Sequence, residues 1–387
     1  MSKVKFGIVG IGNMGSSHVK SINGMSNGEI TCVCDIDPKA FERIAPEMRE
    51  NIRCFTSLDE FLAFPELDAV VVAVPHYDHP SVAIKALNAG KHIVVEKPIT
   101  VHKKMAQELL IESAKHPDKV RALMLNQRTI PAHRKIKQLI DSGELGTITR
   151  VNWIITDWFR SQNYYDSGDW RASWRGEGGG VLLNQCPHQL DLMQWFFGMP
   201  EKVRATAKLG KFHDIEVEDE VNAYLEYADG KTGNFIASTG EMPGTNRLEI
   251  TATRGRLVFE NGKLEFIRNE IPTDTYIKTS TQGFKKSDNW LCNINVSGEA
   301  GNQHQKILIN VANAILNGEE LISPLEEGIK GLELGNAMLL SGLKDQSVTL
   351  PIDAEEFAGH LEKLIAGSRY KKNVSQLKNT DDFGNSF

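Results

Sequence analysis

The stretch GIVGIGNMG, residues 7–15, decides the fold of this 387-residue chain. It closes an apolar, strand-like run and contains the pattern G-x-G-x-x-G. A glycine turn between a strand and a helix lets a ligand approach the backbone and points the helix N-terminus at a pyrophosphate. Alone the pattern is weak, but here it follows the first strand and opens the first helix. We therefore predict that this turn binds a dinucleotide through Gly10, Gly12, Asn13, Met14 and Gly15.

Asp35 closes the next apolar run, about 20 residues after the glycines, where an acidic side chain accepts hydrogen bonds from the adenosine ribose. A carboxylate there repels a 2′-phosphate, so the sequence favours NAD, with NADP the weaker candidate. Asp37 directly precedes Pro38, and we predict that it only caps a helix.

The first third of the chain alternates short apolar runs with helical segments. Apolar strands buried on both faces and separated by helices are typical of a doubly wound parallel sheet. The expected strands are 3–11, 29–35, 68–75, 92–98 and 120–128, and the expected helices are 13–25, 38–48, 79–89 and 132–142.

After about residue 145 the pattern changes to alternating strands joined by short Gly, Asp or Asn turns. This predicts a large, mostly antiparallel open sheet with helices packed on it. The expected strands are 150–159, 202–210, 220–230, 231–240, 247–255, 255–262 and 263–269, and the later helices are 304–317, 325–343 and 354–366.

The fold class is therefore α/β, with an N-terminal Rossmann domain followed by an α+β domain. We place the NAD-binding domain at residues 1–125, the substrate and oligomerisation domain at 126–366, and a polar tail at 367–387.

Composition narrows the class of protein further. A formal net charge of -6 argues against nucleic-acid and membrane partners, since both favour basic surfaces. The N-terminus lacks a signal peptide's apolar region, and no apolar run approaches the roughly 20 residues that span a bilayer. The five cysteines form no CxxC pair. We expect a cytoplasmic protein without a metal site.

Polar residues follow the ends of three expected parallel strands, at the sheet edge that faces a bound cofactor. Lysine at such an edge is usually a solvated charge, but beside a nicotinamide it could have a lowered pKa and take part in proton transfer. The candidates at this edge are Pro75, His76, His79, Glu96, Lys97, Asn126 and Arg128.

A second candidate region is GGGVLLNQCPHQLD, residues 178–191. Spacings of four and three residues place Asn184, His188 and Asp191 on one face of a helix that begins after a run of glycines. A lone histidine on a helix is more often structural, but a glycine run brings backbone close to another group.

Upstream, residues 157–177 contain three Trp, two Tyr, one Phe and three Arg. The segment is either an interface, where Trp and Arg are favoured, or a loop that clamps a sugar ring between aromatic faces. In the second interpretation Trp158, Arg160, Tyr164, Trp174 and Arg175 contact the substrate.

Taken in order, GIGNMG, Asp35, VPHYDHP, EKP and GGG-x4-N-x3-H-x2-D make the chain resemble the Gfo/Idh/MocA oxidoreductase family from residue 3 to about 345. The resemblance implies NAD(P)-dependent redox chemistry on secondary alcohols, with Lys97 and His188 as the reacting pair. It also implies that Trp170 and Arg171 contact the cofactor. The family usually has Asp where this chain has Asn184, and an amide cannot take a proton. Asp191 could orient His188 or could pair within the fold.

The expected activity is therefore NAD-dependent oxidation of a secondary ring hydroxyl on a hexopyranose sugar or glycoside, giving a keto-sugar. His188 would act as general base, Lys97 would polarise the oxygen and Asn184 would hold a neighbouring hydroxyl. The alternatives are an inositol dehydrogenase and a catalytically weak sensor that binds NAD and a sugar. The resemblance also implies a homodimer or homotetramer formed through the C-terminal sheet.

Overall fold

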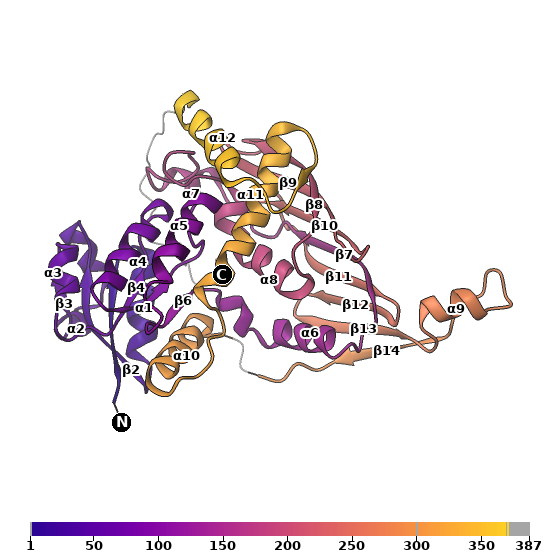
Figure 1. Cartoon of the computed structure of the whole chain (residues 1–387), viewed down its shortest axis with the longest axis horizontal. Helices are drawn as coiled ribbons and strands as arrows, with labels where there is room; N and C mark the ends of the chain where they lie inside the picture. The colour runs from indigo at the N-terminus through magenta and orange to yellow at the C-terminus, as the bar shows by residue number, and fades with distance from the viewer. Residues whose placement is uncertain (1, 299–300, 369, 371–387) are drawn as a thin grey trace.

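The N-terminal part of the chain forms a six-stranded parallel sheet in the order β3-β2-β1-β4-β5-β6 (Figure 1). The computed structural model describes residues 2–298, 301–368 and 370. The strands are β1 (Val4–Val9), β2 (Gly28–Cys34), β3 (Arg53–Phe55), β4 (Ala69–Val72), β5 (His92–Val95) and β6 (Arg121–Leu123). The strand order reverses between β1 and β4, and their carboxyl ends lie at the same edge, so the predicted doubly wound sheet is confirmed.

The helices of this unit are α1 (Asn13–Asn23), α2 (Pro46–Arg49), α3 (Leu58–Leu62), α4 (His79–Asn88) and α5 (Lys103–Ser113). The single helix expected over 38–48 is instead a 3-10 turn, Pro38–Arg43, followed by α2. Pro46 explains the break, because its ring disfavours helix at the preceding residue. Asp37 caps the 3-10 turn as predicted, accepting a hydrogen bond from the Lys39 N–H.

The second unit is built on a nine-stranded sheet in the order β14-β13-β12-β11-β7-β10-β9-β8-β15. All of its neighbouring strands are antiparallel except β7 and β10, which pair in parallel. The strands are β7 (Ile148–Ile155), β8 (Lys202–Leu209), β9 (Glu218–Glu226), β10 (Thr232–Ser238), β11 (Asn246–Ala252), β12 (Gly255–Glu260), β13 (Lys263–Asn269), β14 (Asn289–Ile294) and β15 (Val348–Thr349).

Three helices, α6 (Pro131–Asp141), α8 (Pro187–Phe197) and α11 (Gly328–Lys344), lie between this sheet and the Rossmann unit (Figure 1). Burial alternates along β9, so one face of the strand is covered and the other carries exposed side chains such as Tyr224. The remaining helices are α7 (Gln162–Asp166), α9 (Thr273–Thr279), α10 (Gln303–Asn317) and α12 (Ala354–Gly367), with 3-10 turns at His76–Asp78, Asn126–Thr129 and Leu325–Glu327.

Helix α10 comes late in the chain yet packs on the Rossmann unit (Figure 1). Its buried residues Ile307, Leu308 and Val311 share a core with Phe6 and Ile8 of β1. A boundary at residue 125 therefore leaves out a helix that completes the first core. Most of the predicted polar tail lies outside the described residues.

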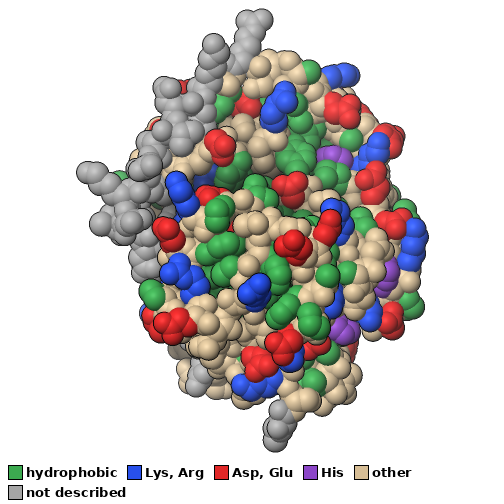
Figure 2. All heavy atoms as spheres, turned by 90° about the vertical axis from the view of Figure 1, so that its left-hand side faces the viewer, with side chains coloured by type: hydrophobic (Ala, Val, Ile, Leu, Met, Phe, Trp, Pro, Cys, Tyr) green, Lys and Arg blue, Asp and Glu red, His purple; other side chains and the backbone are tan. Residues whose placement is uncertain are grey.

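The described part of the chain contains no helix long and apolar enough to cross a bilayer. On the face shown in Figure 2, basic and acidic side chains are interspersed over the surface.

Candidate functional site

The glycine turn has the shape that a pyrophosphate requires. Gly10 has φ +92°, and a Cβ there would lie 2.5 Å from the Ala73 carbonyl oxygen. A Cβ on Gly15 would lie 1.9 Å from the Gly10 carbonyl oxygen, so both glycines are needed for the turn itself. A Cβ on Gly12 would meet nothing within 4 Å, which leaves open space beside the backbone.

Helix α1 begins directly after this turn without a side-chain cap and without an acidic residue in its first turn. Its leading N–H groups and the positive end of its dipole are therefore available to an anion. The open position at Gly12 and the uncapped helix together fit the phosphates of a dinucleotide.

Asp35 lies at the edge of the same turn, at the end of β2. One carboxylate oxygen accepts from the Ile11 N–H at 2.6 Å and the other from the Asp37 N–H at 2.9 Å. These bonds fix the carboxylate beside the glycine turn, where the predicted ribose contact would be made.

Glu96 and Lys97 follow β5 and have different surroundings. Burial alone would raise the pKa of Glu96, but the hydrogen bond and the charge of His18 lower that pKa to about 2. The His18 Nε2 lies 2.6 Å from a Glu96 oxygen. The Lys97 ammonium instead donates to the backbone carbonyl oxygen of Asn184 at 3.0 Å. This hydrogen bond joins the two predicted regions. Burial lowers the pKa of Lys97, and the Glu96 charge opposes that shift.

The segment that carries Asn184 and His188 is not one helix. Val181–Gln185 forms a π-turn, and α8 starts at Pro187. Proline is favoured in the first turn of a helix because it has no N–H to leave unpaired, which explains why α8 begins there. Asn184 and His188 therefore lie on two different elements.

His188 is 3% exposed, and neither of its ring nitrogens has a hydrogen-bond partner among the described residues. Burial, and next the charge of Lys97, lower the pKa of His188 well below its usual range. The imidazole is thus neutral and can accept a proton, which is the state a general base needs.

Asp191 does not face His188. Its two oxygens accept from the Arg128 guanidinium at 2.8 and 2.6 Å, and one also accepts from the Gln194 amide at 2.9 Å. Of the two roles left open for Asp191, the structure favours pairing within the fold. Arg128 is buried in this ion pair and packs on the Trp195 ring, so its guanidinium supports the fold.

Glu177 is a buried carboxylate that the sequence interpretation missed. It is 1% exposed, one oxygen accepts from the Ala172 N–H at 2.6 Å, and the other accepts from the Asn184 side-chain amide. The signal was present in the sequence, since Glu177 directly precedes the glycine run.

Two histidines from the β4 end lie nearby. The His79 ring nitrogens lie 2.8 Å from the Pro98 and Val74 carbonyl oxygens, so this ring ties two strand ends together. His76 is buried, contacts the Glu177 carbonyl oxygen at 3.3 Å and packs edge-on against Trp170. The glycine-run loop and the β4 end therefore meet at His76.

The aromatic segment stacks on itself beside this site. Arg160 lies over the rings of Trp158 and Tyr164, and Arg171 lies over Tyr164 and Trp170. Trp174 is buried at 3% exposure and Arg175 is exposed. The structure thus brings five of the predicted residues into one ladder and leaves Trp174 and Arg175 outside it.

Asn126 also has partners that the sequence did not reveal. Its amide nitrogen lies 2.9 Å from the His304 ring, and His304 packs edge-on against His18. His18 comes from α1 and His304 from α10, so only the folded chain brings them to the β5 and β6 ends. Among the described residues, no group of three His, Cys, Asp or Glu side chains is placed to hold a metal ion.

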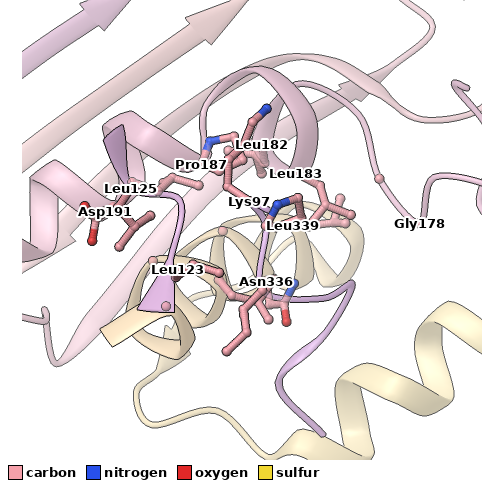
Figure 3. A pocket seen from close by; sticks show the side chains of 18 of the residues that line it. Lys97, Leu123, Leu125, Gly178, Leu182, Leu183, Pro187, Asp191, Asn336 and Leu339 are labelled. Atoms are coloured by element: carbon pink, nitrogen blue, oxygen red, sulfur yellow. The ribbon is translucent and has the colours of Figure 1, made fainter. Parts of the chain in front are cut away.

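A small cavity lies where the EKP segment, the glycine run, α8 and α11 meet (Figure 3). Lys97 and Asp191 line it together with leucines such as Leu182 and Leu339. Its volume is about 30 Å³. Ligand pockets measure roughly 300–1,000 Å³, so this cavity holds water-sized molecules only.

The glycine turn, Asp35 and the uncapped α1 helix together fit a dinucleotide. Lys97 lies at the carboxyl edge of the same sheet, and its charge acts on His188 of α8. Two family models match, the NAD-binding Rossmann fold of an oxidoreductase family over residues 4–123 and the GFO/IDH/MocA C-terminal domain over residues 133–258. The chain belongs to the GFO/IDH/MocA family and is an NAD-binding oxidoreductase.

Curated relatives and solved structures agree with this assignment. An uncharacterised oxidoreductase of Schizosaccharomyces pombe is 33% identical over 60% of this chain, and the chain spans 63% of that relative's length. The inositol 2-dehydrogenase of Rhizobium meliloti is 25% identical over 90% of this chain and 99% of its own. The WlbA dehydrogenase of Bordetella pertussis, solved with NADH and UDP-GlcNAcA, is 27% identical with a TM-score of 0.77, covering 91% of this chain and 99% of that one.

Proposed function

We propose that the protein is an NAD-dependent dehydrogenase that oxidises a secondary ring hydroxyl of a hexopyranose sugar or glycoside to a keto-sugar. The observation that carries the proposal is the hydrogen bond from the Lys97 ammonium to the Asn184 backbone. It brings a cation from the Rossmann unit to the segment that presents a neutral, buried His188.

In the proposed reaction, His188 takes the proton of the substrate hydroxyl. Lys97 donates to the same oxygen and offsets the negative charge that grows on it as the proton leaves. Asn184 holds a neighbouring hydroxyl. The bound nicotinamide supplies the hydride acceptor.

The residues proposed to hold the cofactor come from the glycine turn and from the strand ends around it. A free N–H group at the start of α1 would bind the pyrophosphate, and Asp35 the ribose. The full proposed set is Gly10, Gly12, Asn13, Met14, Gly15, Asp35, Pro75, His76, Glu96, Lys97, Asn126, Trp170 and Arg171.

Three residues of this ladder, Trp158, Arg160 and Tyr164, are proposed to contact the sugar. An aromatic face can stack on the apolar face of a pyranose, while a guanidinium donates to its hydroxyls. Arg128 and His79 are engaged elsewhere in the fold, and Trp174 is buried, so we leave them out of the proposed contacts.

A cyclitol is the second candidate substrate. The R. meliloti relative that aligns over nearly its whole length is an inositol 2-dehydrogenase. Inositols and pyranosides both present equatorial secondary hydroxyls on six-membered rings, so the same Lys–His pair would serve either.

The test is a substrate panel with purified protein and NAD. It includes free hexoses, glucosides, inositols and a nucleotide-linked uronic acid, the last because the WlbA structure holds UDP-GlcNAcA. We expect NADH formation with at least one sugar, and product identification would fix the oxidised carbon. Cofactor binding without turnover across the panel would overturn the proposal and favour the sensor alternative.

We also propose that the protein forms a homodimer or homotetramer through the exposed face of the nine-stranded sheet. An exposed sheet face that carries Tyr224 is a surface suited to burial against a second copy. Light scattering coupled to size exclusion measures the assembly, and a monomer at micromolar concentration would refute it.

A further inference from the structure

The loop before the glycine run places the carboxylate of Glu177 against the side chain of Asn184. Glu177 is 1% exposed and accepts from the Asn184 amide through one oxygen. Its other oxygen accepts from the Ala172 N–H at 2.6 Å. Ala172 has φ +55°, a left-handed conformation that non-glycine residues rarely adopt. The chain thus tolerates a strained residue at the point that holds Glu177 in place.

This contact decides which way the Asn184 amide faces. An amide has a donor end and an acceptor end of nearly equal size, and its partners select the orientation. An ionised carboxylate only accepts, so Glu177 takes the NH₂ end of Asn184. The carbonyl end is left to accept a hydrogen bond from a substrate hydroxyl.

Glu177 also acts on Lys97. Burial lowers the pKa of Lys97, the charges of Glu96 and Glu177 raise it, and Arg171 and Arg160 lower it. The charge of Lys97 in turn lowers the pKa of four other buried side chains, His76, His188, His304 and Cys186. Removing the Glu177 charge would therefore shift the pKa of Lys97 downward.

We propose that Glu177 is a positioning residue that supplies a negative charge to the segment carrying Asn184 and Lys97. It fixes the amide of Asn184 and, together with Glu96, opposes the effect of burial on the Lys97 ammonium. The inference rests on the proposed dehydrogenase function, because Asn184 and Lys97 act on the substrate in that proposal.

The test exchanges the carboxylate and the amide between positions 177 and 184. E177Q removes the charge, and N184D places two carboxylates in contact, which cannot both ionise in a buried site. We expect each single variant to lose about 10-fold to 100-fold in kcat, as for other supporting contacts in active sites. The double variant E177Q/N184D keeps one charge and one amide, and we expect it to recover to within about 10-fold of the wild type.

The pH profile separates positioning from mere support of the fold. If Lys97 must be protonated, activity falls as pH rises past its pKa, and E177Q moves that fall to lower pH. E177D keeps the charge and should keep the wild-type profile even where kcat drops. E333Q is the matched control: it neutralises a buried carboxylate of α11 whose hydrogen bonds go to the Lys103 ammonium and the Ile352 N–H, away from Asn184 and Lys97. Its profile should match the wild type.

Two results would overturn the inference: a double variant no more active than the better single variant, or a pH profile unchanged by E177Q. Thermal melting and NADH binding establish that each variant is folded. Acylation of Lys97 as a function of pH, followed by mass spectrometry without substrate, reports the same shift independently of turnover. A wild type that oxidises nothing would thus sink the proposed function, whereas the acylation profile alone would still decide the role of Glu177.

Discussion

His188 and Glu218 are both buried, and in each case burial favours the neutral form. Burial lowers the pKa of His188 and raises that of Glu218 to about 7. For His188 the neutral form is the one that accepts a proton. For Glu218, two backbone N–H groups of the glycine run stabilise the carboxylate and limit the rise. In the proposed reaction His188 accepts a proton, whereas Glu218 supports the glycine run through two hydrogen bonds.

His188→Ala should abolish turnover and leave NAD affinity nearly unchanged, because the cofactor is held mainly by the Rossmann unit. A general base contributes roughly 10²–10⁴-fold to the rate, so kcat should fall by that factor. Steady-state kinetics and NADH fluorescence measure the two effects. His360→Ala on α12 is the control, since that ring is partly exposed. A variant that keeps more than about a tenth of the wild-type rate would show that the base is another group.

Glu218→Gln should stabilise the protein at high pH more than at low pH. The pKa of Glu218 is raised on folding, so the folded protein keeps a proton that the unfolded chain releases as pH rises from the usual range of Glu to about 7. Stability is lost across that window in the wild type and not in the variant. The difference in free energy of unfolding should grow by up to about 3 kcal/mol between pH 4 and 8. Urea unfolding at both pH values measures it, and a constant difference would contradict the assignment.

The sequence predicted the two ends of the site but not the contacts between them. Lys97 and His188 could be proposed because each belongs to a recognisable segment, and the hydrogen bond from Lys97 to the Asn184 backbone shows that the two segments meet. His18 and His304 could not be found, because they are isolated in sequence and meet Glu96 and Asn126 only after α1 and α10 pack together.

At the scale of elements, the segment from the glycine run through α8 carries Asn184 and His188, two residues of the proposed reaction. Spacing alone predicted one helix for Asn184, His188 and Asp191. Pro187 starts a new helix, and the preceding residues form a π-turn instead. Periodicity predicted most of the long strands and helices, but it missed α5 and β14. Short elements such as β3, α3 and β15 have too few residues to show a period.

Gly180→Ala should disrupt this segment selectively. A Cβ at Gly180 would lie 1.9 Å from the Glu218 carbonyl oxygen, and a strand backbone cannot yield by that much. The π-turn must move, and a displacement of about 1 Å near reacting groups can cost 10²-fold in kcat. NADH affinity should change little.

Gly359→Ala is the matched control for that substitution. A Cβ there meets nothing within 4 Å, and the residue lies inside α12, where alanine is the better helix former. Its kcat should equal the wild-type value. Equal kinetics for the two variants would mean that the glycine run does not position the reacting groups.

On the scale of the whole molecule, the chain crosses between its two units more than once. Helix α10 returns from the second sheet to complete the Rossmann core, and α11 then packs back on α8 (Figure 1). The sequence predicted both sheets but not this return, because an amphipathic helix does not specify which unit it covers. We therefore expect the stability of the cofactor unit to depend on residues about 300 positions from its first strand.

Leu308→Ala tests that dependence in the full-length protein. Leu308 is fully buried on α10 beside Phe6 and Ile8, and truncating such a side chain costs about 2–5 kcal/mol in free energy of unfolding. Leu316→Ala on the same helix is the control, because that side chain is 36% exposed and its loss should cost well under about 1 kcal/mol. Urea unfolding followed by circular dichroism gives both values. If α10 did not complete the Rossmann core in solution, the two substitutions would cost the same.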